Sequence, residues 1–291
     1  MTGGSIRVAA HAKVNLILRV LEREPGGFHR IETLYQRLAL ADDLTVAVTE
    51  GKRTLDIDWP DGGSGPLGPV DENLAWRGAM AYRDAAGWPG GWELMLSKRI
   101  PAGAGLGGGS SDAAAVLQAL ETLAPRPIGA AALREIGATL GSDVPFFLAG
   151  ASVAIGRGRG DVLHALSPLP AASVVLVVPG FPMSTAEAYG QLASARARAH
   201  IAPPTPAFRD TDDFSTWTAI ADRQANHFEG TVFGLYPELE AYKDMLDREG
   251  ALISRLSGSG STVFGLWPAA PRGAVGISRP PQTRLIVTST Y

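Results

Sequence analysis

Apolar and polar residues alternate with a period of two over the N-terminal part of the chain, which predicts strands. Over residues 12–20 the alternation places Lys13 and Asn15 on one face and their neighbours on the other. Short segments that alternate or are apolar throughout recur along the sequence. They predict strands at 6–10, 12–20, 31–40, 44–48, 55–59, 92–96, 152–155, 174–178, 252–256, 262–266 and 284–288.

A helical period appears first at residues 71–86, where Leu74, Ala75, Ala79 and Tyr82 recur on one face. Further helices are expected at 110–123, 130–140, 143–148, 185–192 and 237–249.

Two stretches show no clear period. Residues 194–214, rich in Ala, Arg and Pro, are expected to be irregular. The proline-rich residues 268–282 lack the helical pattern expected near the end of a second domain.

The length of 291 residues corresponds to about two domains. The local pattern of residues changes between residues 160 and 170, so we expect domains at 1–165 and 166–291. The last strand could return to the first domain.

Composition excludes several kinds of chemistry. The absence of cysteine excludes disulfides, iron–sulfur clusters and thiol nucleophiles. A formal net charge of −3 argues against a general nucleic-acid binder. The start of the chain does not resemble a signal peptide, and its most apolar stretch, residues 173–178, is far shorter than the ~20 residues that span a bilayer. We therefore expect a cytoplasmic protein that binds neither nucleic acid nor membrane.

Residues 101–114 contain a glycine loop followed by a helical pattern. Five glycines in seven residues (103–109) allow successive N–H groups to converge on an anion, and the start of the next helix adds its unpaired N–H groups. A bland turn with a serine cap would not need so many glycines, so phosphate binding is favoured. The candidate phosphate-binding residues are Pro101, Gly103, Ala104, Gly105, Leu106, Gly107, Gly108, Gly109, Ser110 and Ser111.

Two familiar nucleotide-binding loops do not fit this segment. Gly103, Gly105 and Gly108 match G-x-G-x-x-G, but no strand follows the helix soon enough for a Rossmann unit. No Gly-Lys-Ser/Thr closes the loop, so it is not a Walker A motif.

Four shorter motifs each have an ordinary explanation when taken alone. Lys13 and Asn15 could lie on the exposed edge of a sheet, and residues 26–30 could form a surface turn. Asp143 could be a helix N-cap, and residues 257–261 could form a hairpin turn. Their order along one chain is more specific than any one of them.

The glycine loop resembles the phosphate loop of the superfamily of galactokinase, homoserine kinase, mevalonate kinase and phosphomevalonate kinase (GHMP kinases). Within it, five segments in order are similar to the 4-diphosphocytidyl-2-C-methyl-D-erythritol kinase family of the non-mevalonate isoprenoid pathway. The segments are Ala12–Leu16, Gly27–His29, the glycine loop, Gly141–Phe147 and Ser257–Gly260.

The resemblance implies an α+β fold of two domains, with a ribosomal S5 domain-2-like N-terminal domain and a ferredoxin-like C-terminal domain. It implies that the γ-phosphoryl group of ATP, with Mg²⁺, passes to the 2-hydroxyl of 4-diphosphocytidyl-2-C-methyl-D-erythritol. Asp143 would be the catalytic base, and Lys13 would position the hydroxyl and stabilise charge. Small molecules would be the partners, and the chain would be a monomer or weak homodimer.

The resemblance also implies which residues bind each substrate. Lys98 and Asn73 would lie near the adenine. Phe28 and Phe181 would sandwich the cytosine, because aromatic faces stack on nucleobases. The residues implied for the cytidine substrate are Asn15, Phe28, His29, Phe181, Thr185 and Tyr189.

Four positions depart from the family pattern. Gly26 and Phe28 stand where the family usually has Asp and Tyr, His11 where it often has Pro, and Asp112 where it often has Asn. Phe28 keeps the stacking face without the hydroxyl, and Asp112 brings negative charge near a phosphate.

Other functions are opposed by the sequence. Another kinase of the same superfamily is the nearest rival, and Gly27-Phe28-His29 with Phe181 favours the cytidine substrate. A nicotinamide dehydrogenase lacks its βαβ context, an RNA-binding module lacks a basic run, and neither G-x-S-x-G nor H-E-x-x-H occurs.

Overall fold

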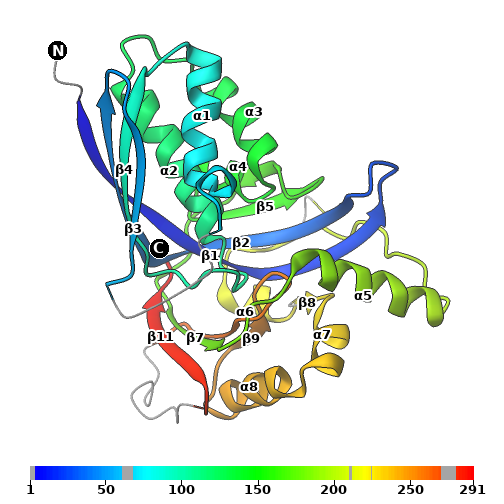
Figure 1. Cartoon of the computed structure of the whole chain (residues 1–291). Coiled ribbons are helices and arrows are strands. Elements are labelled where there is room, and N and C mark those ends of the chain that lie inside the picture. Colours follow the sequence, from blue (N-terminus) through cyan, green and yellow to red (C-terminus); the bar gives the residue numbers. More distant parts are fainter. Residues whose placement is uncertain (1–3, 61–67, 210–211, 224, 270–279) are drawn as a thin grey trace. The chain divides into compact units, whose positions relative to one another are not determined.

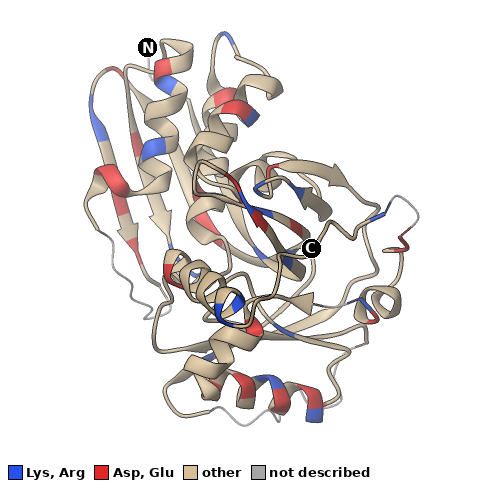
Figure 2. Cartoon of the chain, turned by 90° about the vertical axis from the view of Figure 1, so that its right-hand side faces the viewer, with Lys and Arg blue, Asp and Glu red and all other residues tan. Residues whose placement is uncertain are grey.

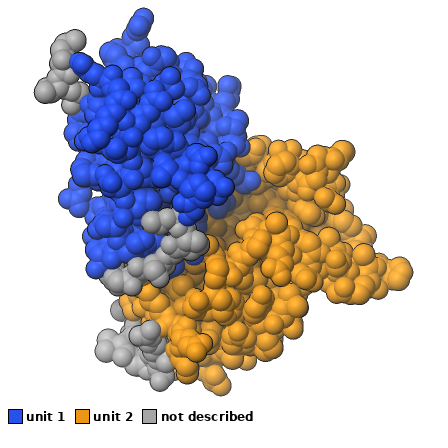
Figure 3. All heavy atoms as spheres, in the orientation of Figure 1, with its two compact units in different colours: residues 1–12, 40–102, 107–150 blue, residues 13–39, 103–106, 151–291 orange. Residues whose placement is uncertain are grey.

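The computed structural model describes residues 4–60, 68–209, 212–223, 225–269 and 280–291. Its contacts form two compact units, shown in Figure 3. Unit 1 comprises residues 1–12, 40–102 and 107–150, and unit 2 comprises residues 13–39, 103–106 and 151–291. The units interleave along the chain, and the linear boundary expected at residue 165 stays a prediction.

Two long strands contribute to both units. β1 (Ser5–Arg23) joins the strands expected at 6–10 and 12–20, and β2 (His29–Thr49) joins those expected at 31–40 and 44–48. A period of two continues through each join, so the backbone stays extended.

Unit 1 contains part of a mixed sheet. β3 (Arg53–Asp58) runs parallel to β4 (Gly91–Ser97), and β4 pairs antiparallel with residues 43–49 of β2. In β4, Trp92, Leu94 and Leu96 are buried whereas Met95 is exposed, as expected for a strand with one face on the core.

The described residues of unit 1 also contain five helical segments. They are η1 (Val70–Glu72), α1 (Leu74–Ala86), α2 (Gly108–Leu123), α3 (Ala130–Leu140) and α4 (Val144–Leu148). Figure 1 shows α1, α2 and α3 side by side, and α2 is buried against its neighbours over residues 111–117 and 119–120, most of them apolar. The packing against the neighbouring helices fixes the position of the start of α2, where the glycine loop ends.

In unit 2, the remainder of the first sheet is built on β1 and β2. β5 (Val153–Arg157) pairs antiparallel with residues 33–36 of β2 and with β6 (Val162–Ala165). The two-residue β8 (Ala225–Asn226) pairs parallel with β1 at Ile17 and Leu18.

A second, antiparallel sheet belongs wholly to unit 2. Its order is β11 (Thr283–Ser289), β7 (Ser173–Pro179), β10 (Val263–Trp267), β9 (Ile253–Leu256). The last strand pairs with β7 along its length. The helices of unit 2 are α5 (Thr185–Arg198), α6 (Trp217–Ala221), α7 (Glu229–Leu235) and α8 (Pro237–Arg248).

One apolar core supports this second sheet. Val175, Val177, Leu256 and Val263 from the strands are buried together with side chains of α5, α7 and α8. Fully burying such an aliphatic side chain stabilises the fold by about 1.5–3 kcal/mol. α8 carries four acidic and two basic residues, and Figure 2 colours acidic residues red and basic residues blue.

Several elements differ from their expected bounds. α5 continues to Arg198, so the prediction of irregular chain from residue 194 is wrong for its first turn and a half. β6, α6, β8 and α7 were not predicted, because each is short and lacks a clear period. The expectation for residues 268–282 falls mostly outside the described residues. Within the described ranges, no helix is long and apolar enough to cross a membrane.

Candidate active site

Lys13 and Asn15 lie on one face of β1, as their spacing predicts, and both are buried. Lys13 Nζ donates to Asn15 Oδ1 at 2.8 Å, and Asn15 Nδ2 donates to Thr33 Oγ1 on β2 at 2.7 Å. A buried ammonium is tolerated because its protons are hydrogen-bonded. The explanation of this face as an exposed edge is wrong.

The glycine loop (residues 101–109) and a second glycine loop (residues 257–261) meet at Gly105. Its carbonyl oxygen accepts hydrogen bonds from Lys13 Nζ and from Ser257 Oγ, each at 2.9 Å. Gly105 has a φ of +77°, and a Cβ placed there would lie 2.2 Å from the carbonyl oxygen of Ser257. Only glycine fits at this crossing.

The second glycine loop also contacts predicted substrate residues. Ser259 Oγ lies 3.1 Å from Thr185 Oγ1, and Ser261 Oγ donates to the carbonyl oxygen of Phe181 at 2.8 Å. The loop joins the antiparallel strands β9 and β10, so it is a hairpin turn as well as part of this cluster.

Asn226 holds the second glycine loop and was missed by sequence reasoning. Its Nδ2 donates to the carbonyl oxygens of Leu256 (2.7 Å) and Gly258 (2.8 Å), while its Oδ1 accepts from the amide of Phe228 at 2.9 Å. No periodic pattern surrounds Asn226 in the sequence, and its role depends on pairing between β8 and β1.

Three predicted cytidine-binding residues take part in two aromatic stacks. His29 stacks on Tyr189 with ring centroids 4.7 Å apart, and Phe181 stacks on Tyr236 at 5.0 Å. Burial, together with the charges of Arg23 and Arg196, lowers the pKa of His29. A neutral imidazole has one donor and one acceptor nitrogen, which suits recognition of a base edge.

In unit 1, α2 begins inside the glycine run. Gly107 occupies the N-cap position with a φ of +72°, and α2 starts at Gly108, two residues before the expected start. Ser110 and Ser111 are therefore helical residues and not caps. The unpaired N–H groups of the first turn belong to this glycine–serine segment, as an anion site requires.

Lys98 and Asn73, predicted near the adenine, are both engaged within unit 1. Lys98 Nζ lies 2.5 Å from Asp42 Oδ2 and 2.7 Å from Asp112 Oδ2. Asn73 caps α1, since its Oδ1 accepts from the amide of Ala75 at 2.9 Å. Their role toward adenine stays a prediction.

Asp143 occupies the N-cap position of α4, with Pro145 in the first turn. Its side chain makes no capping hydrogen bond, so the explanation as a helix cap is not supported. Asp143 belongs to unit 1 and Lys13 to unit 2. Their joint role in catalysis stays a prediction.

Comparisons with known proteins cover nearly the whole chain. The family models "GHMP kinases N terminal domain" and "GHMP kinases C terminal" match residues 73–151 and 206–275. The 4-diphosphocytidyl-2-C-methyl-D-erythritol kinase of Solibacter usitatus is 44% identical over 263 residues, which are 89% of this chain and 80% of that protein. The enzyme of the same name from Geobacter sulfurreducens is 39% identical, over 90% of each chain.

This chain belongs to the 4-diphosphocytidyl-2-C-methyl-D-erythritol kinase family.

Solved structures agree with this family and with the expected α+β fold of two domains. A crystal structure of 4-(cytidine 5'-diphospho)-2C-methyl-D-erythritol kinase aligns over 98% of this chain and 99% of its own, with a TM-score of 0.77 and 36% identity. A mevalonate kinase of L. major aligns with a TM-score of 0.67 at 13% identity, covering 100% of this chain and 98% of its own, and shares the fold.

In this family member, Phe28 packs against Arg159, a contact that was not predicted from the sequence. The guanidinium of Arg159 lies over the Phe28 ring, 4.0 Å from its centroid. Arg159 Nε and Nη2 also donate to Glu24 Oε2 at 3.0 and 2.9 Å. The Phe28 residue is 54% exposed, so much of its surface remains accessible.

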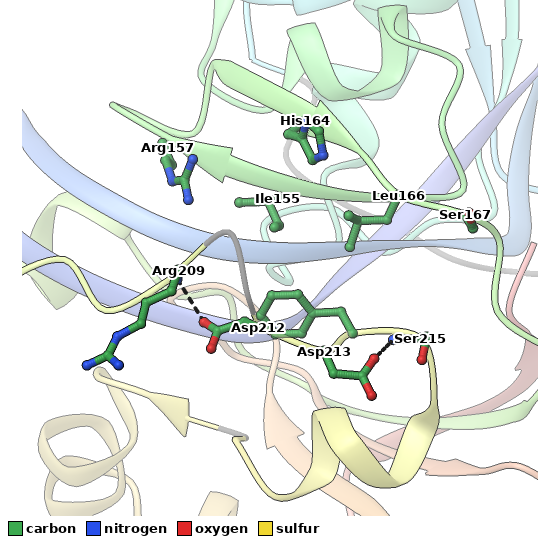
Figure 4. Close-up of a pocket in the computed structure, with 10 residues that line it drawn as sticks. Ile155, Arg157, His164, Leu166, Ser167, Arg209, Asp212, Asp213 and Ser215 are labelled. Atoms are coloured by element: carbon green, nitrogen blue, oxygen red, sulfur yellow. Dashed lines mark hydrogen bonds between the residues drawn. The ribbon is translucent and has the colours of Figure 1, made fainter.

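A separate cavity of about 400 Å³ lies in unit 2 of this kinase family member (Figure 4). Ile155 and Leu166 form part of its apolar wall, and Arg157 and His164 add polar groups. The residues that line it include none of the predicted site residues.

Proposed function

We propose that this protein transfers the γ-phosphoryl group of ATP to the 2-hydroxyl of 4-diphosphocytidyl-2-C-methyl-D-erythritol, giving the 2-phosphate and ADP. This is a step of non-mevalonate isoprenoid precursor synthesis. The observation that carries the proposal is the 44% identity to a kinase of this name over 263 residues.

In this proposal Asp143 is the catalytic base and Lys13 stabilises the transferring group. Phosphoryl transfer depends mainly on positioning and electrostatics. An alcohol is a far weaker acid than a carboxylic acid, so Asp143 accepts the proton late, as the hydroxyl oxygen bonds to the phosphorus and becomes more acidic. The ammonium of Lys13 is held by Asn15 and by the carbonyl of Gly105, which restricts it to one place.

ATP phosphates bind the glycine loop and the start of α2 in this proposal. Mg²⁺ is proposed as the ion that neutralises part of the phosphate charge. Across the described residues, no group of three or more His, Cys, Asp or Glu side chains is placed to hold a metal. Mg²⁺ is commonly bound through substrate phosphates with only one or two carboxylates.

The cytidine substrate binds the aromatic cluster of unit 2 in this proposal. His29 reads the base edge, and Phe28 and Phe181 stack on its faces. Asn15 holds the phosphoryl-accepting substrate by hydrogen bonds. Thr185 and Tyr189, which lie four residues apart on one face of α5, also contact this substrate. A cytoplasmic location and a monomer or weak homodimer are also proposed.

An ADP-release assay with magnesium-ATP tests this function. One well holds 4-diphosphocytidyl-2-C-methyl-D-erythritol, and parallel wells hold mevalonate, phosphomevalonate, homoserine and galactose. We expect ADP release with the cytidine substrate alone. ADP release with another acceptor would overturn the assignment of a pyrimidine-binding site. No ADP release in any well would argue against kinase activity.

A further inference from the structure

Three charged side chains of unit 1 meet at the start of α2. Lys98 Nζ bridges Asp42 and Asp112, and all three side chains are at least nine-tenths buried. A Cβ added at Gly108 would lie 3.4 Å from Lys98 Nζ, so the ammonium is close to the backbone of the first residue of α2. With all three groups ionised, this cluster carries one net negative charge.

The two carboxylates differ in their hydrogen bonds. Asp42 uses both oxygens, because Oδ1 accepts from the amides of Arg99 (2.5 Å) and Ile100 (2.8 Å) and Oδ2 accepts from Lys98. Asp112 Oδ2 accepts from Lys98, but Asp112 Oδ1 is buried with no hydrogen-bond partner. Hydrogen bonds favour the ionised form, so Asp112 is the carboxylate that takes a proton more readily.

Burial also raises the pKa of Asp112, to about 7, against the opposing charge of Lys98. Burial lowers the pKa of Lys98, but the two carboxylates raise it more, so the ammonium stays charged. The cluster therefore gains or loses a proton at Asp112 near neutral pH.

We propose that Asp112 takes up a proton when the phosphates of ATP bind at the start of α2, so that ATP binding is coupled to protonation. This inference rests on the proposed function, because it needs ATP at residues 108–111. The proton comes from solvent and protonates the Asp112 carboxylate. The charge of the cluster then changes from −1 to 0 beside the incoming phosphates.

The physical reason is repulsion between like charges. A bound phosphate disfavours an ionised carboxylate nearby, and a shift of one pKa unit corresponds to a tenfold change in affinity. The charges that act on Asp112 are chiefly Lys98 and Asp42. Charged residues on the elements packed against α2 are Arg77, Arg83 and Asp84 of α1, Arg134 and Glu135 of α3, and Asp143 before α4.

Titration calorimetry of magnesium-ATP binding tests the proposal. Near pH 7, two buffers of different ionisation enthalpy give the number of protons taken up by the wild type and by Asp112→Asn. ATP and buffer are the same for both proteins, so the difference isolates Asp112. We expect uptake of a fraction of a proton in the wild type and none in the variant.

Affinity should follow the same rule. Between about pH 6 and about pH 8, ATP affinity of the wild type should fall about tenfold relative to Asp112→Asn. Asp43→Asn is the matched control, since Asp43 is a neighbouring acid paired with Arg7 and Arg99, and it should behave as the wild type.

Three outcomes would overturn the proposal. ATP binding to the wild type without proton uptake overturns it, even if the variant does not fold. If Asp112→Asn lost the same factor of ATP affinity at about pH 6 and at about pH 8, Asp112 would have a purely structural role. No ATP binding by the wild type at either pH would overturn the proposed function itself.

Discussion

The ammonium of Lys13 donates a hydrogen bond to the carbonyl oxygen of Gly105, 92 residues further along the chain, at 2.9 Å. The same carbonyl accepts from Ser257 in the second glycine loop. One backbone group therefore joins the proposed catalytic lysine to both glycine loops. Its position depends on a glycine backbone, which leads to the first prediction.

Gly105→Ala should destabilise the protein and reduce activity at least tenfold. The new Cβ would meet the carbonyl oxygen of Ser257, and a non-glycine residue at positive φ costs on the order of 1–3 kcal/mol. Urea unfolding and steady-state rates measure the two effects. Gly234→Ala in α7, where a Cβ meets nothing within 4 Å, is the control and should retain full activity. Normal activity in Gly105→Ala would contradict the close approach of the loops.

Asp143→Asn should remove nearly all turnover while ATP binding is retained, because the amide cannot accept the hydroxyl proton. Rapid-quench turnover and calorimetric ATP binding measure the two properties. Asp84→Asn, at an exposed position of α1, is the control and should be fully active. Normal turnover in Asp143→Asn would exclude Asp143 as the base.

Phe181→Ala should raise KM for the cytidine substrate by roughly tenfold, because loss of a stacking ring costs on the order of 1 kcal/mol or more. KM for ATP should stay near the wild-type value. Steady-state kinetics with each substrate varied in turn measure both constants. Equal increases in the two KM values would argue against stacking on the base.

Arg159→Gln should raise KM for the cytidine substrate by a few-fold, since a cation–π contact at an exposed site contributes about 0.5–1 kcal/mol. The guanidinium both covers Phe28 and bonds to Glu24, so its loss frees the ring to move. A double-mutant cycle with Phe28→Leu measures the coupling between the two residues. Additive effects of the two substitutions would refute the idea that Arg159 acts through Phe28.

Asp112→Asn should change how stability depends on pH. The pKa of Asp112 is raised by burial from 3.8 to about 7 in the folded protein, so the folded state binds more protons between these values. Stability of the wild type therefore falls as pH rises through this window, by on the order of 1.4 kcal/mol per pKa unit. Urea unfolding at about pH 5 and about pH 8 should show a weaker pH dependence in the variant. An unchanged dependence would contradict a protonated, buried Asp112.

The long strands and main helices could be predicted because their residues repeat with a clear period. α3 was predicted with its observed bounds, and β4 within one residue at each end. β8 and α7 have too few residues to show a period. Asn226 of β8 pairs with β1 and bonds to the second glycine loop, and its Oδ1 accepts from the amide of Phe228, just before α7. Such elements depend on tertiary contacts that a local pattern does not contain.

The candidate site could be predicted in part for the same reason. The shared face of Lys13 and Asn15 follows from the period of a strand, and the glycine loops from their composition. Tyr236 and Arg159 could not be found this way, because each meets its partner, Phe181 or Phe28, across a large separation in sequence.

The most direct test of the central claim is the ³¹P NMR spectrum of the product made from 4-diphosphocytidyl-2-C-methyl-D-erythritol and magnesium-ATP. The 2-hydroxyl is on a tertiary carbon that carries no hydrogen. We therefore predict one new phosphomonoester signal without three-bond coupling to a carbon-bound proton, together with stoichiometric ADP. A new signal split by such coupling would place the phosphate on another hydroxyl, and no new signal would contradict the proposed kinase activity.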